Sequence, residues 1–291
     1  MCVFVSSTTK HKWAIISPAR SSRPDNFSVN QEFKQKMCPF CPGNENLEEE
    51  VLRYGSAINK SDWQLRVVKN KYPITNFHEV VIHSPEETEL DDLPVLHVEL
   101  IIKAYTERFN ALKDKGNVII FCNQGEHAGA SLKHPHSQIA VIPTDKRLEI
   151  LERESPENIV EKNDYFSMYC PSFSQWPYEI WIAPKVDQGV FGDINNIQIQ
   201  NLAILLQNAI RKLKTVYENR SFLMLPFAYN FYIYPQENWY VRIIPRFIHK
   251  GGLELATGID VNIKDPLKAS IELQEHKNVG MILEKLLEKS N

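Results

Sequence analysis

The chain has 291 residues, of which 43% are hydrophobic and 24% are charged, an ordinary balance for a globular protein with a large core. Its 33 lysines and arginines and 36 aspartates and glutamates give a formal net charge of −3, so a clustered positive surface for nucleic acid is not expected. No apolar stretch approaches the roughly 18 uninterrupted residues of a membrane span. From the charge we expect no nucleic-acid partner, and from the absence of such a stretch we expect no membrane partner.

Five cysteines are spread along the chain, at Cys2, Cys38, Cys41, Cys122 and Cys170. An odd number argues against a disulfide framework, and the start "MCVFVSSTTKHKW" has no signal-peptide pattern, so we expect a cytoplasmic protein. Cys38 and Cys41, in "CPFCPGNE", have the spacing of both zinc sites and redox motifs. A polar segment before them and a Pro-Gly-Asn break after them favour a metal-binding knuckle, which needs further ligands from elsewhere.

The first half of the chain predicts a strand pair, a helix and a second strand pair. The extended stretch is residues 65–85, and the helix runs from about Asp91 to Lys113, with its apolar residues near one face. A strand at 117–123, a glycine-containing loop and a strand that ends at Pro143 follow.

The second half repeats this order, with an extended stretch at 165–184, a helix from Ile199 to Tyr217, and strands in 227–235 and 238–247. Aligning Pro143 with Pro245 places Gln236, Asn238 and Tyr240 at the positions of His134, His136 and Gln138. The second copy therefore keeps the pattern of elements but lacks the histidines.

We predict an α+β fold of two fused repeats, residues 1–145 and 146–291, which together form a curved, mainly antiparallel sheet with flanking helices. Residues 145–164 predict a charged, helical surface connection. Residues 265–290 predict a helix that packs on the outside of the fold.

Three polar residues alternate along the segment that leads into the strand ending at Pro143, namely His134, His136 and Gln138. Residues two apart on a strand point to the same face, so these side chains are expected to project together. Polar groups on one face of an apolar strand are destabilising unless they have partners or ligands, which makes this a candidate site. The alternative is a solvated edge strand, with Pro135 marking the edge.

With these residues in place, the sequence resembles the galactose-1-phosphate uridylyltransferase family, the two-repeat branch of the histidine-triad superfamily. The resemblance is carried by "WAIISPARSSRP", "CPFCPGNE", "VVKNKYP", "CNQGEHAGASLKHPHSQ", "WPYEIWIAP", "IIPRF" and "GGLELATG". It implies two histidine-triad-like repeats and a homodimer.

The resemblance implies that His136 attacks the α-phosphorus of a nucleoside-diphosphate sugar and carries the nucleotide covalently, with ping-pong kinetics. An ordinary imidazole pKa of about 6.5 leaves a neutral, nucleophilic nitrogen at cellular pH. Gln138 would donate a hydrogen bond to a phosphate oxygen, and Ser131 belongs to the loop that faces the phosphates.

The resemblance also implies a set of substrate-binding residues: Arg20, Arg23, Asn70, Asn123, Gly129, Ala130 and Glu254. The two arginines would bind phosphate, although "RSSR" alone is typical of an exposed loop. Asn70 would contact the nucleoside, and Asn123, Gly129 and Ala130 the phosphates. Glu254 would contact the hexose, often from the neighbouring subunit.

For metal, the resemblance implies zinc (Zn2+) bound by Cys38, Cys41 and His134 in a structural role. Glu87 stands where the family often has a histidine, and His83 is a competing fourth ligand; a rebuilt or empty site is the other alternative. A second metal site in some family members draws on histidines that the second repeat lacks, so we expect no second site.

The first hypothesis for function is transfer of a nucleotide from a nucleoside-diphosphate hexose to a hexose 1-phosphate in carbohydrate metabolism. UDP-glucose and galactose 1-phosphate, and hence galactose metabolism, are the first candidates. The glutamine that normally follows Glu254 is missing, which weakens the galactose assignment. The alternative is phosphorolysis of an ADP-sugar or a dinucleoside polyphosphate by inorganic phosphate. A hypothesis of another class is a catalytically inactive, zinc-stapled nucleotide-binding protein.

Other histidines and the tryptophans favour structural interpretations. His78, His97 and His249 are expected to be isolated, satisfied histidines, whereas His127 is equally consistent with a place in the phosphate pocket. Trp176, Trp181 and Trp239 are expected to pack in the core rather than to stack on a base.

Overall fold

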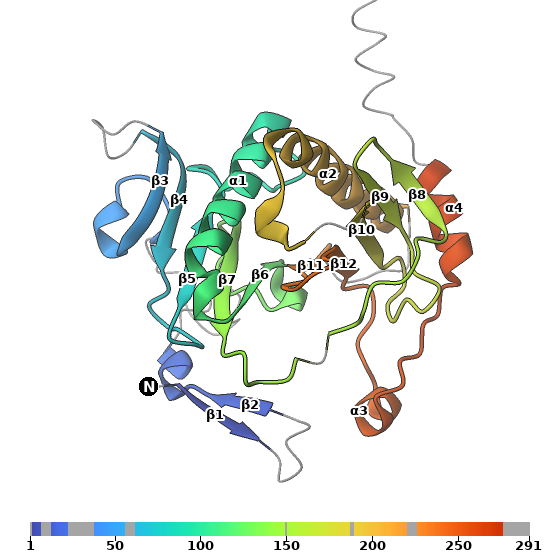
Figure 1. The fold of residues 1–291 in the computed structure, drawn as a ribbon, viewed down its shortest axis with the longest axis horizontal. Coiled ribbons are helices and arrows are strands. Elements are labelled where there is room, and N and C mark those ends of the chain that lie inside the picture. Colours follow the sequence, from blue (N-terminus) through green and yellow to red (C-terminus); the bar gives the residue numbers. More distant parts are fainter. Residues whose placement is uncertain are drawn as a thin grey trace, which may run out of the picture.

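The computed structural model describes residues 2–6, 13–22, 38–55, 62–148, 150–186, 189–219 and 226–275. Within these residues a small hairpin of β1 (Val3–Ser6) and β2 (Trp13–Ile16) stands beside a ten-stranded sheet (Figure 1). The described helices include none that is long and apolar enough to cross a membrane.

The large sheet contains five strands from each half of the chain. Those of the first half are β3 (Glu50–Gly55), β4 (Trp63–Lys69), β5 (His78–Ile82), β6 (Asn117–Gln124) and β7 (His136–Ile142). Those of the second half are β8 (Ile159–Lys162), β9 (Phe166–Tyr169), β10 (Ile180–Pro184), β11 (Tyr229–Ile233) and β12 (Val241–Pro245). The four α-helices of the described residues are α1 (Val95–Leu112), α2 (Asn196–Glu218), α3 (Gly252–Thr257) and α4 (Pro266–Glu275).

The strand order, β3-β4-β5-β7-β6-β11-β12-β10-β9-β8, has the same pattern on both sides of its middle. The two halves meet where β6 pairs antiparallel with β11, with Gln124 opposite Tyr229 and Ile120 opposite Ile233. From this seam outward, each half presents its fourth, fifth, third, second and first strand, and its helix lies between the third and fourth along the chain. The predicted α+β fold of two fused repeats is confirmed, while the division at residue 145 remains a prediction.

Both long helices pack against one apolar cluster that draws on both halves of the sheet. On α1, Val98, Ile101, Tyr105 and Phe109 are buried at the three- and four-residue spacing of one helix face. A second set with the same spacing is buried on α2 and comprises Leu202, Leu206, Ile210 and Leu213. The side-chain amide of Gln207, on α2, donates to the backbone carbonyls of Leu90 and Leu93, in the segment just before α1.

The start of α2 shows why the helix begins where it does. The Asn195 side chain accepts a hydrogen bond from the Gln198 backbone N–H (3.0 Å), and the Gln198 side chain accepts one from the Asn195 backbone N–H (2.9 Å). This reciprocal capping satisfies two donors that a helix otherwise leaves without partners.

The predicted helix in the connection between the halves is wrong. The described part, residues 145–148 and 150–164, contains no helix; its one regular element is β8, an edge strand paired with β9. Pro156 lies within it and disfavours a continuous helix, and Ile159 and Val160 suit a strand. The C-terminal prediction is confirmed as far as α4, which packs against α2 and β8, and residues 276–291 lie outside the described part.

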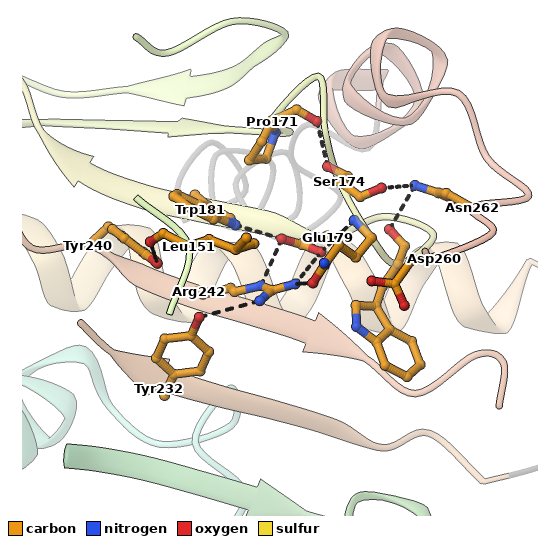
Figure 2. A network of polar contacts seen from close by, with 12 residues as sticks. Leu151, Pro171, Ser174, Glu179, Trp181, Tyr232, Tyr240, Arg242, Asp260 and Asn262 are labelled. Atoms are coloured by element: carbon orange, nitrogen blue, oxygen red, sulfur yellow. Dashed lines mark hydrogen bonds and ion pairs between the residues drawn. The ribbon is translucent and has the colours of Figure 1, made fainter. Parts of the chain in front are cut away.

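In the second repeat, the strand that aligns with the His-Pro-His strand carries structural side chains. Arg242 on β12 forms a buried, two-point ion pair with Glu179, at 2.8 and 2.9 Å (Figure 2). The indole N–H of Trp181 donates to the same carboxylate at 2.7 Å, and the Trp181 ring stacks on Tyr240 with centroids 3.8 Å apart. Trp176, Trp181 and Trp239 are all buried, as predicted.

Candidate active site

The segment that carries the candidate nucleophile is an interior strand of the large sheet. β7 lies between β5 and β6, with His136 opposite Ile82 and Gln138 opposite Val80. His136 and Gln138 are each 7% exposed. The predicted common face is therefore correct for this pair, and the alternative of a solvated edge strand is wrong.

The two faces of β7 have different surroundings. Ile139 and Val141 belong to the apolar cluster under the helices, so the alternate residues His136 and Gln138 face the opposite side. On that side a second, smaller cluster contains Phe40, Trp63, Val68, Val80 and Ile82. The candidate catalytic side chains thus lie on the face that α1 and α2 leave uncovered.

His136 is held by the residue two positions before it. Its Nδ1 atom lies 2.8 Å from the backbone carbonyl oxygen of His134. A carbonyl oxygen only accepts, so this contact assigns the ring hydrogen of neutral His136 to Nδ1 and the lone pair to Nε2. Nε2 is then the ring nitrogen able to attack an electrophile. The Phe40 ring packs edge-on against the imidazole, with centroids 5.3 Å apart.

The loop between β6 and β7 brings small residues next to this strand. Gly125 has a φ of +84°, and an added Cβ would lie 2.9 Å from Cβ of Ala228 in the second repeat. Gly129 has a φ of +83° with nothing near its missing side chain. Ala130 follows it, and Ser131, 9% exposed, lies in the same loop. The loop therefore depends on glycine both for its turns and for its close approach to the second repeat.

Asn123 lies at the end of β6, where the register that pairs Cys122 with Ser137 places it beside His136. The side-chain amide of Asn230, on β11, donates to Asn123 Oδ1 at 2.8 Å and to the carbonyl of Ala128 at 2.9 Å. The second repeat thus contributes a residue that holds the loop between β6 and β7, and no pattern in the sequence indicates this role for Asn230.

Arg20 and Asn70 converge on the same region through His78. Nη1 of Arg20 donates to the backbone carbonyl of Tyr72 at 2.8 Å. Burial, together with the charge of Arg20, lowers the pKa of His78. The side-chain nitrogen Nδ2 of Asn70 is 3.3 Å from Nε2 of His78. The same Nε2 atom is 3.0 Å from Oε1 of Gln138. Arg23 lies outside the described residues.

Glu254 is not brought to His136 within one chain. Its carboxylate accepts the backbone N–H of Gly251 at 3.0 Å and caps α3. Figure 1 shows α3 standing apart from β7 at the end of extended connections.

Cys38, Cys41, Glu87 and His134 form a cluster whose candidate ligand atoms all lie within 4.8 Å of one another. Nδ1 of His134 is 3.8 Å from Sγ of Cys38 and 3.6 Å from Sγ of Cys41. Nε2 of His134 is 2.8 Å from the carbonyl oxygen of Ser84, the outer contact typical of a metal-binding histidine. Two sulfurs, one imidazole nitrogen and one carboxylate fit tetrahedral zinc.

The structure distinguishes Glu87 from His83 as the candidate fourth ligand of the cysteine cluster. Nε2 of His83 lies 2.6 Å from the hydroxyl of Ser137, which Tyr105 also contacts, and His83 does not join the cysteine cluster. Burial lowers the pKa of His83 well below its usual range, so the ring is neutral inside the fold.

The electrostatics of the cysteine cluster favour a cation. Burial opposes ionisation of Cys38, but hydrogen bonds with His134 and the Phe40 backbone hold the pKa of this thiol below its ordinary value. Burial and the neighbouring Cys38 and Glu87 raise the pKa of Cys41 to about 12. Three donors that become negative on ionisation repel one another, and a divalent cation relieves that repulsion.

The interpretation of His78, His97 and His249 as satisfied surface or core histidines agrees with their contacts. His78 contacts Gln138, His97 contacts the carbonyl of His83 at 2.7 Å, and His249 packs on His127 with ring centroids 6.1 Å apart. These partners come from other strands and loops, so spacing along the chain carries no signal for them.

Comparisons with known proteins agree with this geometry. The description "Domain of unknown function (DUF4931) N-terminal domain" matches residues 21–144. ADP-glucose phosphorylase of Arabidopsis thaliana is 28% identical over an alignment of 305 residues. The alignment covers 87% of this chain and 86% of that protein. A galactose-1-phosphate uridylyltransferase of Thermotoga maritima is 29% identical over 208 residues, covering 60% of this chain and 64% of that protein.

Solved structures extend the likeness to both repeats. The crystal structure of an Arabidopsis thaliana ADP-glucose phosphorylase with bound ADP-glucose has a TM-score of 0.70 and 26% identity, over 96% of this chain and 100% of that chain. A uridylyltransferase mutant shares the fold, with a TM-score of 0.72 and 21% identity over 94% of this chain and 97% of that chain. By sequence and by fold, the chain is similar to ADP-glucose phosphorylase and to galactose-1-phosphate uridylyltransferases.

Proposed function

We propose that the chain is a nucleotidyltransferase that moves a nucleoside monophosphate from a nucleoside-diphosphate hexose to a phosphate-bearing acceptor by way of His136. The observation that carries the proposal is the buried His136, whose Nδ1 is held by the His134 carbonyl so that Nε2 has the lone pair. A histidine used only for packing does not need a fixed tautomer beside a glycine-containing loop.

In the first step Nε2 of His136 forms a bond to the α-phosphorus, and the bond from that phosphorus to the bridging oxygen breaks. The sugar 1-phosphate leaves with the electron pair. In the second step a phosphate oxygen of the acceptor attacks the same phosphorus, the N–P bond breaks, and the electron pair returns to Nε2. The hydrogen stays on Nδ1 of His136, donated to the His134 carbonyl oxygen, in both steps, so no proton needs to leave the ring.

The surrounding residues have separate tasks in this scheme. Gln138, on the same strand face, donates to a non-bridging phosphate oxygen as charge moves onto it. Arg20 and Arg23 neutralise phosphate charge, and Asn70 contacts the nucleoside. Asn123, Gly129, Ala130 and Ser131 form the loop against the phosphates.

Two acceptors are supported. The resemblance to galactose-1-phosphate uridylyltransferases favours a hexose 1-phosphate, with UDP-glucose as donor. The alternative is inorganic phosphate with ADP-glucose as donor, favoured because the match to an ADP-glucose phosphorylase covers 87% of this chain. Incubation with UDP-glucose or ADP-glucose, with and without phosphate, separates them: glucose 1-phosphate released in catalytic excess only with phosphate identifies a phosphorylase.

We also propose a structural zinc ion bound by Cys38, Cys41, Glu87 and His134. The support is the approach of the four donors to one another and the Ser84 contact on the far side of the His134 ring. When bound, the ion would fix the knuckle that packs Phe40 against His136; the chemical steps use the residues described above.

A homodimer is proposed from the surface of α3 and the segment after it. Exposed apolar side chains gather there, namely Leu253, Leu255, Ile259, Val261 and Ile263. Such a patch is typical of a surface covered by a partner. In this arrangement Glu254 contacts the hexose bound by the other subunit. Mixing inactive His136→Asn with inactive Glu254→Ala chains should restore activity; no restoration contradicts a shared site.

The hypothesis of another class, an inactive nucleotide-binding protein, predicts nucleotide binding without a covalent adduct on His136. Calorimetric binding of a nucleotide together with an unchanged intact mass would favour it. Wild-type and His136→Asn chains would then have the same biochemical properties.

A further inference from the structure

His78 is buried on β5, and both nitrogens of its ring have partners. Nδ1 lies 3.1 Å from the backbone N–H of Ile74, and Nε2 lies 3.0 Å from Oε1 of Gln138. A backbone N–H only donates, so Nδ1 must hold the lone pair, and the hydrogen of a neutral ring is then on Nε2. The Nε2–H of His78 therefore donates to Oε1 of Gln138, and the 3.3 Å approach of the Asn70 amide nitrogen to the same Nε2 is a contact between two donors, not a hydrogen bond.

The ring is neutral under ordinary conditions. Burial, together with the positive charge of Arg20, lowers the pKa of His78 to about 4, although the Gln138 contact acts in the opposite direction. At neutral pH the ring thus has one hydrogen, whose position the Ile74 amide fixes.

This contact decides which end of the Gln138 amide is available to a ligand. The oxygen and nitrogen of a glutamine amide are nearly identical in shape but opposite in hydrogen bonding. With the oxygen taken by His78, the NH2 group is the end left for a ligand on the shared face. Phosphate oxygens only accept, so the amide must present its NH2 group to be useful.

We propose that His78 is a positioning residue that fixes the orientation of the Gln138 amide, so that Gln138 donates to the phosphate being transferred. The inference rests on the proposed function and deepens it. His78 acts through Gln138 and does not itself touch the substrate.

A purely structural role for His78 is the competing explanation, because the ring also anchors residues 70–77. Ile74 donates to its Nδ1, and the Asn70 backbone N–H donates to the His78 carbonyl at 2.8 Å. The two nitrogens can be tested separately. The amide oxygen of asparagine can replace Nδ1 as the acceptor for Ile74, and the amide nitrogen of glutamine can replace Nε2 as the donor to Gln138.

The test is a mutant cycle on the single-turnover rate at which the nucleotide appears on His136, measured by intact mass with ADP-glucose and UDP-glucose. We expect His78→Asn to slow this step by about tenfold to a hundredfold, with KM and the thermal midpoint close to wild type. His78→Gln should keep most of the rate. If His78→Asn does not fold, His78→Leu replaces it in the cycle.

The deciding comparison is the effect of His78→Asn in the wild-type chain against its effect in a chain that already has Gln138→Ala. In Gln138→Ala chains, His78→Asn should cause no further loss of rate, because the group it orients is gone. The inference is overturned if His78→Asn lowers the single-turnover rate equally with and without the Gln138 amide. It is also overturned if His78→Asn keeps the rate and His78→Gln does not. Either result leaves the proposed function intact. Absence of any adduct on the wild-type chain overturns the proposed function, and this inference with it.

Discussion

Nδ1 of His136 lies 2.8 Å from the carbonyl oxygen of His134, the residue whose own ring faces Cys38 and Cys41. The candidate nucleophile and the candidate metal cluster are therefore connected through one residue and one hydrogen bond. Phe40, between the two cysteines in sequence, packs edge-on against both His134 and His136. A change at the metal cluster should thus reach the nucleophile without any contact between metal and substrate.

The metal cluster is tested by replacing its exposed carboxylate. Glu87→Ala should lower zinc affinity by at least about tenfold and slow nucleotide transfer, because one ligand is lost and the knuckle loosens. Zinc per chain after dialysis against a chelator gives the readout. Glu86→Ala is the matched control, since Glu86 is also exposed and lies outside the cluster. Equal zinc retention by both variants would show that Glu87 is not a ligand.

Stability should depend on pH through His78. Its pKa is about 4 in the folded chain and 6.5 ordinarily, so below pH 6.5 the unfolded chain binds a proton that the folded chain does not. The contribution of His78 to the free energy of unfolding is therefore fully present above pH 6.5. It falls as pH drops toward 4, by at most about 3 kcal/mol.

Chemical unfolding at several pH values tests this prediction, with His78→Gln as the comparison because glutamine does not titrate. The free energy of unfolding of wild type minus that of the variant should fall, by at most about 3 kcal/mol, as pH drops from 6.5 to 4. A constant difference would show that His78 keeps its ordinary pKa.

Two glycines of the loop between β6 and β7 should respond differently to alanine. Both have positive φ, but only Gly125 approaches another chain segment, 2.9 Å from Cβ of Ala228 and 3.1 Å from the carbonyl oxygen of Phe227. Gly129→Ala should lower the free energy of unfolding by about 1–2 kcal/mol from backbone strain, and Gly125→Ala by about 2–5 kcal/mol from strain plus collision. Urea unfolding measures both, and a larger loss at Gly129 contradicts the described contact between loop and second repeat.

The helices and strands whose apolar or polar residues recur at a regular helix or strand spacing were predictable from the sequence. Apolar residues at helical spacing located α1 and α2, and the alternation around His136 located the strand and the common face of His136 and Gln138. The connection at 145–164 was predicted wrongly because its charged, leucine-containing stretch has helical character. Its place at the sheet edge and the hydrogen bond from the Tyr240 hydroxyl to the Leu151 carbonyl depend on the tertiary fold.

The parts of the site that the sequence did not predict depend on register between distant strands. His78 reaches Gln138 because β5 and β7 pair with Val80 opposite Gln138, which puts His78 one diagonal step away on the same face. Asn230 reaches Asn123 because these residues are paired across the seam between β6 and β11. Glu87 and His83 were both open as fourth ligands, and only the three-dimensional arrangement separates them.

The central claim is that Nε2 of His136 takes the nucleotide. Intact-mass measurement after mixing with UDP-glucose or ADP-glucose, followed by peptide mapping, should find one nucleotidyl group on His136. His136→Asn should show no adduct and a turnover lowered by about 10,000-fold or more, whereas His97→Asn, away from β7, should label as wild type does. An unchanged mass for the wild-type chain, or an adduct that persists in His136→Asn, would contradict the account.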